Sequence, residues 1–148
     1  MIGATIGAAL AVSLAAAVIA LRRRFVSVLV EGTSMEPTLS AGQRVLVRRT
    51  GAERIHCGQL VVLARPTGAV TRPEPGDPPW LIKRVAAVAG DPVPRDTVPA
   101  LRYASEPRVP AGRLVVLGDN QAASYDSRRA GYFTASTVLG VVVRLPRA

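Results

Sequence analysis

A serine and a lysine are the two side chains of this sequence best suited to chemistry. Ser34 lies in residues 32–39 (GTSMEPTL), between two runs of branched aliphatic residues, where a strand is expected to give way to a tight turn. Lys83 is the only lysine, and the other 18 basic residues are arginines. Arginine keeps its proton in proteins, whereas a buried lysine can lose its proton and act as a base. A neutral Lys83 within about 3 Å of Ser34 would activate the hydroxyl as a nucleophile.

A polar stretch at residues 118–128 (GDNQAASYDSR) supplies groups that could support this pair. Ser124 could orient the lysine amine by a hydrogen bond, while Asp126 and Arg128 could pair and fix the loop. The backbone amide of Ser34, held beside the hydroxyl by the tight turn, is a candidate donor to an oxyanion.

Other kinds of site find less support in the sequence. His56 is the only histidine and lies in a polar turn, so a Ser-His-Asp triad is a poor alternative. Cys57 is the only cysteine, which excludes an intrachain disulfide. No group of His, Cys, Asp and Glu has the spacing of metal ligands. The sequence therefore predicts neither a metal site nor an organic cofactor.

The first 21 residues are predicted to form a transmembrane anchor. Residues 2–21 carry no charge and are mostly Ala, Val, Ile and Leu, which matches the roughly 20 residues needed to cross a bilayer as a helix. Arg22, Arg23 and Arg24 follow this run, whereas a cleaved secretory signal would carry its positive charge before it. We expect a retained anchor at 1–21, a basic juxtamembrane linker at 22–27, and a β domain with the candidate catalytic residues at 28–148.

The chain after the anchor is predicted to be all-β. Six runs rich in Val, Leu and Ile are separated by turn signals that contain Gly, Pro or Asn. They lie at residues 26–30, 44–47, 59–63, 81–88, 113–117 and 138–143. In a regular strand at 81–88, Lys83 and Arg84 would point to opposite faces. The pattern predicts a folded-over sheet or small barrel.

Two stretches rich in proline interrupt the pattern of strands. Residues 66–80 are expected to form an exposed loop between two strands. Residues 92–110 are expected to form another loop or a reduced second subdomain.

Four motifs in this order resemble those of type I signal peptidases, the serine-lysine proteases of family S26. They read Ser-Met-x-Pro-Thr-Leu at 34–39, Gly-Gln-Leu-Val-Val-Leu at 58–63, Ile-Lys-Arg-Val and Gly-Asp within 82–91, and Gly-Asp-Asn, Ser-x-Asp-Ser-Arg and Gly within 118–131. The resemblance implies a membrane-anchored all-β protease that removes signal peptides after small residues at the first and third positions before the cut, the Ala-x-Ala type. It further implies that Ser34 is the nucleophile, Lys83 the general base, Ser124 the group that orients the lysine, and Asp126 with Arg128 the supporting ion pair.

The sequence departs from the family pattern in three places. Gly32 stands where some members have a serine that completes the oxyanion hole, so the hole would rely on the Ser34 amide and another donor. Only 34 residues separate Lys83 from Gly118, which resembles the short, mitochondrial inner membrane type of the family. Gln59, Gln121 and Ala122 replace residues that are more often charged, which should affect the packing of loops more than chemistry.

Two arguments about the topology disagree. The positive-inside rule predicts that residues 22–148, which begin with the three arginines, lie in the cytoplasm. The resemblance implies a catalytic domain on the trans side of the membrane, where signal peptides present their cut sites. We expect a single-pass protein of the cell membrane with an extracytoplasmic catalytic domain. Its expected partners are precursors with signal peptides and membrane lipid.

Three alternatives remain open at the level of sequence. The same chemistry could serve one exported precursor as a dedicated maturation protease. A self-cleaving repressor would share the serine-lysine chemistry, but it needs an amino-terminal helix-turn-helix where this chain has an apolar run. A non-catalytic membrane protein could use the net charge of +9 to bind lipid or nucleic acid. Such a protein would not need Ser34, Lys83 and Ser124 together, and the few aromatic residues argue against nucleic acid as a partner.

Overall fold

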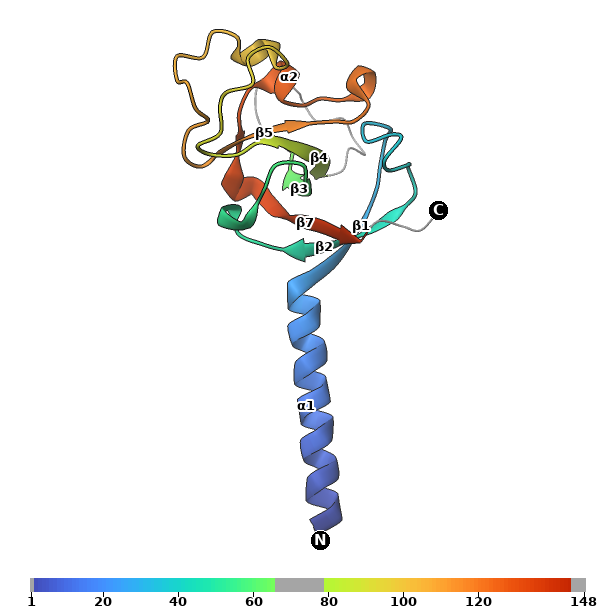
Figure 1. Ribbon diagram of the computed structural model, residues 1–148. Coiled ribbons are helices and arrows are strands. Elements are labelled where there is room, and N and C mark those ends of the chain that lie inside the picture. The colour runs from blue at the N-terminus through green and yellow to red at the C-terminus, as the bar shows by residue number, and fades with distance from the viewer. Residues whose placement is uncertain (1, 66–78, 145–148) are drawn as a thin grey trace.

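The computed structural model describes residues 2–65 and 79–144, which form one long helix followed by a β domain (Figure 1). Helix α1 (Ile2–Arg24) ends on three arginines, whose charges favour the negative end of the helix dipole. Strand β1 (Phe25–Leu29) begins at the next residue. Residues 22–27, expected to form a linker, are therefore divided between the last turn of α1 and the start of β1.

The predicted transmembrane anchor is not confirmed by the structure. In the part of the chain that the structure describes, no helix is both long enough and apolar enough to cross a membrane.

The β domain is one antiparallel sheet of seven strands that curls into a half-barrel. Its strands lie in the order β1-β2-β7-β3-β4-β5-β6, so the last strand of the chain lies in the middle of the sheet. The remaining strands are β2 (Arg44–Arg49), β3 (Leu60–Ala64), β4 (Trp80–Ala87), β5 (Arg113–Leu117), β6 (Phe133–Thr134) and β7 (Val138–Arg144). Runs of β-branched and aliphatic residues favour these strands, because such side chains pack well on a pleated surface.

Irregularities in the pairing help the sheet to curl. The register shifts between Leu46 and Val47 where β2 meets β7, and again where β7 meets β3 and where β4 meets β5. Shifts of this kind bend a strand and increase its twist. Gly140 lies where β7 crosses β2, and a Cβ atom there would lie 2.2 Å from the carbonyl oxygen of Arg48. Only glycine allows the two strands to approach this closely.

Apolar side chains gather in three clusters within the domain. One lies among β3, β4, β5 and β7, and a second joins β1 and β2 to β3 and β4 and includes Met35 and Leu39 from the turn after β1. The third covers the end of β4 and β5 with residues from the 92–110 stretch, among them Val98 and Leu101. This stretch carries the short 3-10 turn η2 (Pro99–Leu101) and a bridge between Pro92 and Arg108. It is thus a packed loop rather than a second sheet.

The mostly β architecture agrees with the sequence prediction, and each of the six predicted runs contains most of one strand. The predicted loop at 66–80 lies outside the described residues except for its last two positions, and Trp80 begins β4. The structure adds elements that the sequence pattern did not indicate. These are strand β6, helix α2 (Ser127–Ala130) and the 3-10 turns η1 (Ala52–Arg54), η3 (Gln121–Ala123) and η4 (Ala135–Thr137).

Candidate active site

The turn that carries Ser34 is fixed by its own hydrogen bonds and by two buried side chains. The amide of Glu36 donates to the carbonyl of Thr33 at 3.1 Å, and the amide of Leu39 donates to that of Met35 at 2.9 Å. Met35 and Leu39 are almost fully buried in the cluster beneath the turn. Ser34, which lies between exposed Thr33 and buried Met35, is half-buried at the edge of this core. The apolar positions of the turn thus hold the hydroxyl at the surface of the sheet.

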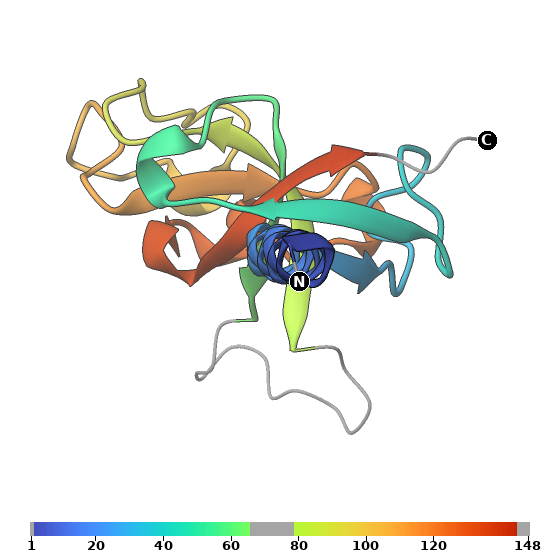
Figure 2. The ribbon, with the colours of Figure 1, turned by 90° about the horizontal axis from the view of Figure 1, so that it is seen from below.

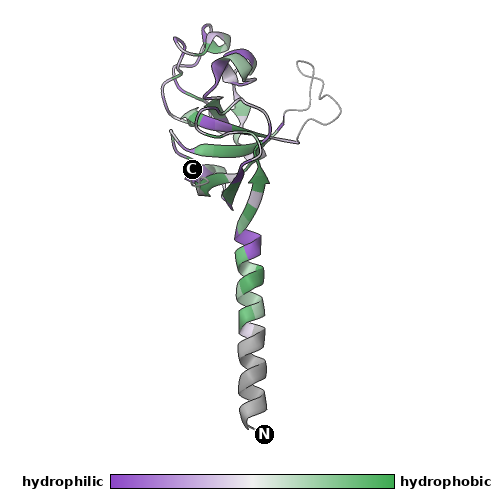
Figure 3. Ribbon diagram, turned by 90° about the vertical axis from the view of Figure 1, so that its right-hand side faces the viewer, coloured by the Kyte–Doolittle hydropathy of each residue, from purple (hydrophilic) through white to green (hydrophobic). Residues whose placement is uncertain are grey.

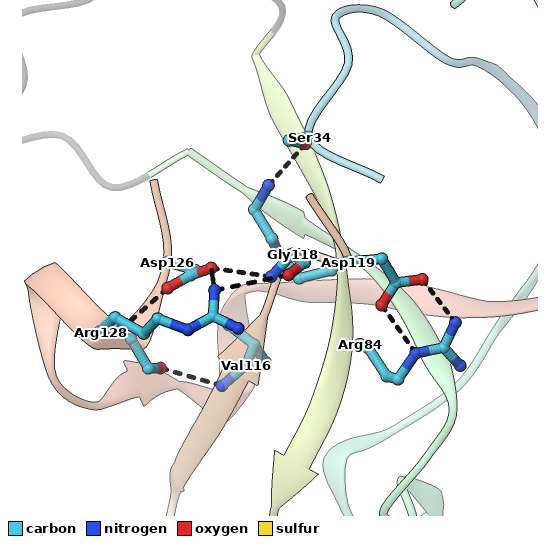
Figure 4. Close-up of polar contacts among 9 residues, drawn as sticks. Ser34, Arg84, Val116, Gly118, Asp119, Asp126 and Arg128 are labelled. Atoms are coloured by element: carbon cyan, nitrogen blue, oxygen red, sulfur yellow. Dashed lines mark hydrogen bonds and ion pairs between the residues drawn. The ribbon is translucent and has the colours of Figure 1, made fainter. Parts of the chain in front are cut away.

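Lys83 lies in the middle of β4, which pairs with β3 on one side and β5 on the other. The side chain shares a face of the strand with Leu81 and Val85, and it is only 2% exposed. Its Nζ donates a hydrogen bond to Ser34 Oγ at 2.8 Å. The structure therefore brings together the serine and the lysine that were predicted to act as a pair (Figure 4).

The environment of Lys83 favours its neutral form. Burial lowers the pKa of the amine from 10.5 to about 8, because it removes water from the charged form. Nearby Arg65 lowers this pKa further, whereas Asp126 and Asp119 act in the opposite direction. With a pKa of about 8, roughly one lysine in ten is neutral at pH 7. The amine is therefore within reach of a base role near neutral pH.

The turn that follows β5, at residues 118–120, packs against the turn that carries Ser34 and donates a hydrogen bond to it. The amide of Asn120 donates to the carbonyl of Ser34 at 3.0 Å. At Gly118, a Cβ atom would lie 2.7 Å from that carbonyl oxygen and 2.1 Å from Ser124 Oγ. No side chain fits between these groups, which explains why glycine begins this stretch.

Asp126 is fully buried and connects helix α2 to β5. One carboxylate oxygen accepts from the amide of Gly118 at 2.8 Å and from Arg128 Nη1 at 2.8 Å. The other accepts from the amide of Arg128 at 3.0 Å and so caps the helix. Ser127 Oγ adds a buried bond from the amide of Val116 at 2.9 Å. The predicted ion pair of Asp126 and Arg128 is therefore present. β6 pairs only with Arg113 and Leu114, and Asp126 and Ser127 accept hydrogen bonds from backbone amides farther along this edge.

A second ion pair, which the sequence analysis did not predict, lies on the other side of β4 (Figure 4). Arg84 donates to Asp119 from Nε at 2.9 Å and from Nη2 at 2.7 Å. Thr38 Oγ1, from the turn that carries Ser34, donates to the same carboxylate at 2.5 Å. Arg84 holds the pKa of the Asp119 carboxyl below its usual value. As predicted, Lys83 and Arg84 lie on opposite faces of β4. That alternation indicated the direction of Arg84 but not its partner Asp119.

The predicted hydrogen bond between Ser124 and the lysine amine is not formed. Ser124 Oγ is buried, and it has no hydrogen-bond partner among the described residues. The hydroxyl lies against the backbone of Gly118, while the amine of Lys83 is directed to Ser34. The role of Ser124 as a group that orients the lysine stays a prediction.

The backbone amide of Ser34 has no hydrogen-bond acceptor within residues 2–65 and 79–144. Gly32, two positions earlier, has a φ of 72°. A serine at this position would be strained, since only glycine adopts such a backbone readily. The local backbone therefore favours glycine at this position.

A groove with a volume of about 240 Å³ opens beside Ser34 and Lys83. Strand β1 and the turn after it form one wall, and the beginning of β4 forms the other. The floor is mostly apolar, and Arg65 and Glu31 bring opposite charges to the lining. The groove is lined by Leu29, Val30, Glu31, Gly32, Thr33, Ser34, Met35, Arg65, Trp80, Leu81, Ile82, Lys83, Ala123 and Tyr125.

The chain matches one protein family across most of its length. The model of the family described as signal peptidase, peptidase S26, matches residues 4–101 and 95–145. No curated protein matches the sequence at a significant level.

Proposed function

The chain belongs to the signal peptidase family, peptidase S26, and from this premise we propose that it is a serine endopeptidase with Ser34 as nucleophile and Lys83 as general base. The observation that carries the proposal is the hydrogen bond of 2.8 Å between Lys83 Nζ and Ser34 Oγ. The lysine is buried, and its lowered pKa leaves a neutral fraction that can accept a proton.

In the proposed reaction, neutral Lys83 accepts the proton of Ser34 as Oγ attacks the scissile carbonyl carbon. The Ser34 amide donates to the oxyanion that forms. The lysine then gives its proton to the departing amine, and the C–N bond breaks to leave an ester on Ser34. Water, deprotonated by the same lysine, attacks this ester. The bond between the acyl carbon and Ser34 Oγ breaks, the lysine returns its proton to Oγ, and the new carboxyl terminus is released.

The groove supports an extended substrate with small side chains. β1 has a neighbour on one side only among the described strands, so its other edge is free to pair with a peptide. Alternate residues of an extended peptide point to the same side. The first and third residues before the cut would both face the apolar lining formed by Val30, Leu81 and Ile82, and a groove of about 240 Å³ suits small residues at these positions.

Membrane attachment and an extracytoplasmic catalytic domain are also part of the proposal, and they rest on the sequence alone. Carbonate extraction and protease protection of the full chain in membranes of known sidedness test them. Release of the chain by carbonate would contradict the anchor. Protease added to the extracytoplasmic side should digest the β domain. A β domain that is digested only by protease on the cytoplasmic side would contradict the orientation.

The proposed activity is tested with a precursor that carries an Ala-x-Ala site. The detergent-solubilised full chain should cut after the second alanine, as read by the mass of the fragments. Ser34→Ala and Lys83→Arg should both lose at least about a thousandfold in rate, because one removes the nucleophile and the other an amine that can be neutral. Arg129→Gln, at an exposed position, serves as the control. Unchanged cleavage by folded Lys83→Arg would contradict the assigned base.

The range of precursors separates a general peptidase from a dedicated one. Cleavage of several unrelated precursors supports removal of signal peptides in general. Cleavage of a single precursor among many supports the dedicated maturation protease that the sequence leaves open. No cleavage of any precursor by the folded chain would contradict both.

A further inference from the structure

The β domain carries an exposed basic face next to the last turn of α1. Along β2, Arg44, Leu46 and Arg48 alternate with buried Val45 and Val47 and are all exposed. The side chains of one strand face therefore reach solvent, and two of the three are charged.

Strand pairing places this face beside the end of α1. Phe25, the first residue after α1, pairs with Arg48, and Leu29 pairs with Arg44. Figure 2, seen from below, shows β2 and β7 crossing close to the helix, and Figure 3 shows hydrophilic residues where α1 meets the domain. We use the name arginine face for the exposed residues of this region, which are Arg22, Arg23, Arg24, Leu29, Arg44, Leu46 and Arg48.

The charges of the arginine face are not balanced within the domain. Within residues 2–65 and 79–144, ion pairs join Arg54 to Glu53, Arg84 to Asp119 and Arg128 to Asp126. None of the five arginines of the arginine face has such a partner in the described part of the chain. Two such arginines on β2, with three more in the last turn of α1, attract anions to this end of the domain.

We propose that the arginine face binds the anionic headgroups of a phospholipid bilayer. Two apolar side chains, Leu29 at 37% exposure and Leu46 at 36%, lie between the arginines. Guanidinium groups bind phosphate while their stems and such apolar neighbours suit the boundary of the acyl chains. Single-stranded nucleic acid, the other polyanion, is bound by stacking on exposed aromatic rings. Phe25 is the one aromatic residue within residues 22–29 and 44–49, and it is half-buried.

This inference builds on the proposed membrane attachment but not on the serine-lysine chemistry. With the domain held against the bilayer by β1 and β2, the groove beside β1 would lie close to the lipid surface. A signal peptide bound in that groove could then leave its apolar segment in the membrane.

The experiment uses the full chain in micelles of a neutral detergent, titrated with phosphatidylglycerol or with phosphatidylcholine. Retained lipid is counted by native mass spectrometry. Wild type should prefer phosphatidylglycerol, and Arg44→Gln/Arg48→Gln should weaken its binding by roughly 25-fold, at about fivefold per arginine. Arg44→Lys/Arg48→Lys keeps the charge and should retain most of the preference.

A matched control separates the arginine face from net charge. Arg102→Gln/Arg129→Gln removes the same charge from exposed positions near η2 and α2, at the end of the domain away from α1 (Figure 1), and should leave the preference unchanged. An equal loss in this control, or no loss in Arg44→Gln/Arg48→Gln, would overturn the proposal. Tighter binding of a short single-stranded RNA than of phosphatidylglycerol would overturn it as well. Cleavage of a precursor in detergent, measured on the same samples, reports separately on the proposed protease.

Discussion

Arg84 and Asp119 form a two-bond ion pair in which each partner follows a residue of the candidate site in the chain. Arg84 follows Lys83, and Asp119 follows Gly118. Thr38 Oγ1 donates to the same carboxylate from the turn that carries Ser34. The pair therefore ties together the strand of the proposed base, the corner below Ser34 and the Ser34 turn itself.

A double-mutant cycle measures this connection. Arg84→Gln and Asp119→Asn should each destabilise the chain, with a coupling of about 1 kcal/mol, because the Arg84 side chain is 37% exposed and its charge is partly screened. Denaturant unfolding in detergent gives the four free energies. Each single variant should also slow cleavage, since the Ser34 turn loses a tether. Additive free energies would contradict the connection, and Arg113→Gln, exposed and remote, serves as control.

The rate of cleavage should depend on pH through Lys83. The proposed base acts when neutral, and its pKa is about 8, so kcat/KM should rise with pH and level off above about 8. Rates from pH 6 to 10 on a precursor whose own groups do not titrate there give the apparent pKa. A rate that falls through this range would contradict the role of the neutral amine.

The charge of Arg65 offers a second test of the same pKa. Arg65 lines the groove and lowers the pKa of Lys83 through its positive charge. Arg65→Gln should therefore raise this pKa and move the rise in kcat/KM to higher pH, whereas Arg113→Gln should leave it in place. A shift to lower pH in Arg65→Gln would contradict the statement that the positive charge of Arg65 lowers the pKa of Lys83.

The buried amine should also make stability depend on pH. In the unfolded chain the lysine has its usual pKa of 10.5, and in the folded chain a pKa of about 8, so the unfolded state binds more protons between these values. Stability should therefore rise between pH 8 and 10, by on the order of 2 kcal/mol, and the cost of burying the charge should be fully present below pH 8. Lys83→Met should remove this rise. Unfolding curves at fixed ionic strength measure it, and an equal slope in Lys83→Met would contradict the assignment.

Loss of the Asp126 carboxylate should unfold or strongly weaken the domain. Asp126→Ala leaves the amide of Gly118 and the guanidinium of Arg128 without their buried acceptor, which should cost about 3–5 kcal/mol. Asp126→Asn keeps an acceptor oxygen and should cost less. Thermal and denaturant unfolding compare the two. An effect as small as that of exposed Arg129→Gln would show that the carboxylate does not hold β5 and α2 together.

Hydrophobic pattern was enough to predict six of the seven described strands, and it placed Lys83 within one of them. Nearly continuous runs of branched residues fall within β3, β4 and β5, because both faces of the sheet are largely covered there. The single lysine among many arginines pointed to Lys83, and its place in an apolar strand between Ile82 and Val85 indicated burial. These signals are local, so they can be read along the chain.

The remaining parts of the site depend on contacts between distant segments. The ion pair of Arg84 and Asp119 joins residues 35 positions apart, and neither residue type is unusual for a surface. Helix α2 has only four residues, and Asp126 caps its first turn. A helix this short gives no helical period in the sequence. Ser124 makes no hydrogen bond to Lys83, because its hydroxyl packs on Gly118 while the amine is directed to Ser34. Spacing in sequence does not determine how closely this loop packs, so the orienting role of Ser124 stays a prediction.

The position of β7 has a consequence for the order of events during synthesis. Ser34 follows β1 on one side of β7, and Lys83 lies on β4 on the other side. The last strand of the chain is thus the one that joins the two halves of the sheet. A ribosome must synthesise the chain through β7 before nucleophile and base can meet, so a nascent chain that lacks β7 should be inert toward precursors that pass beside it. A stop codon a few residues before Val138 should yield a protein with every proposed catalytic side chain and no activity.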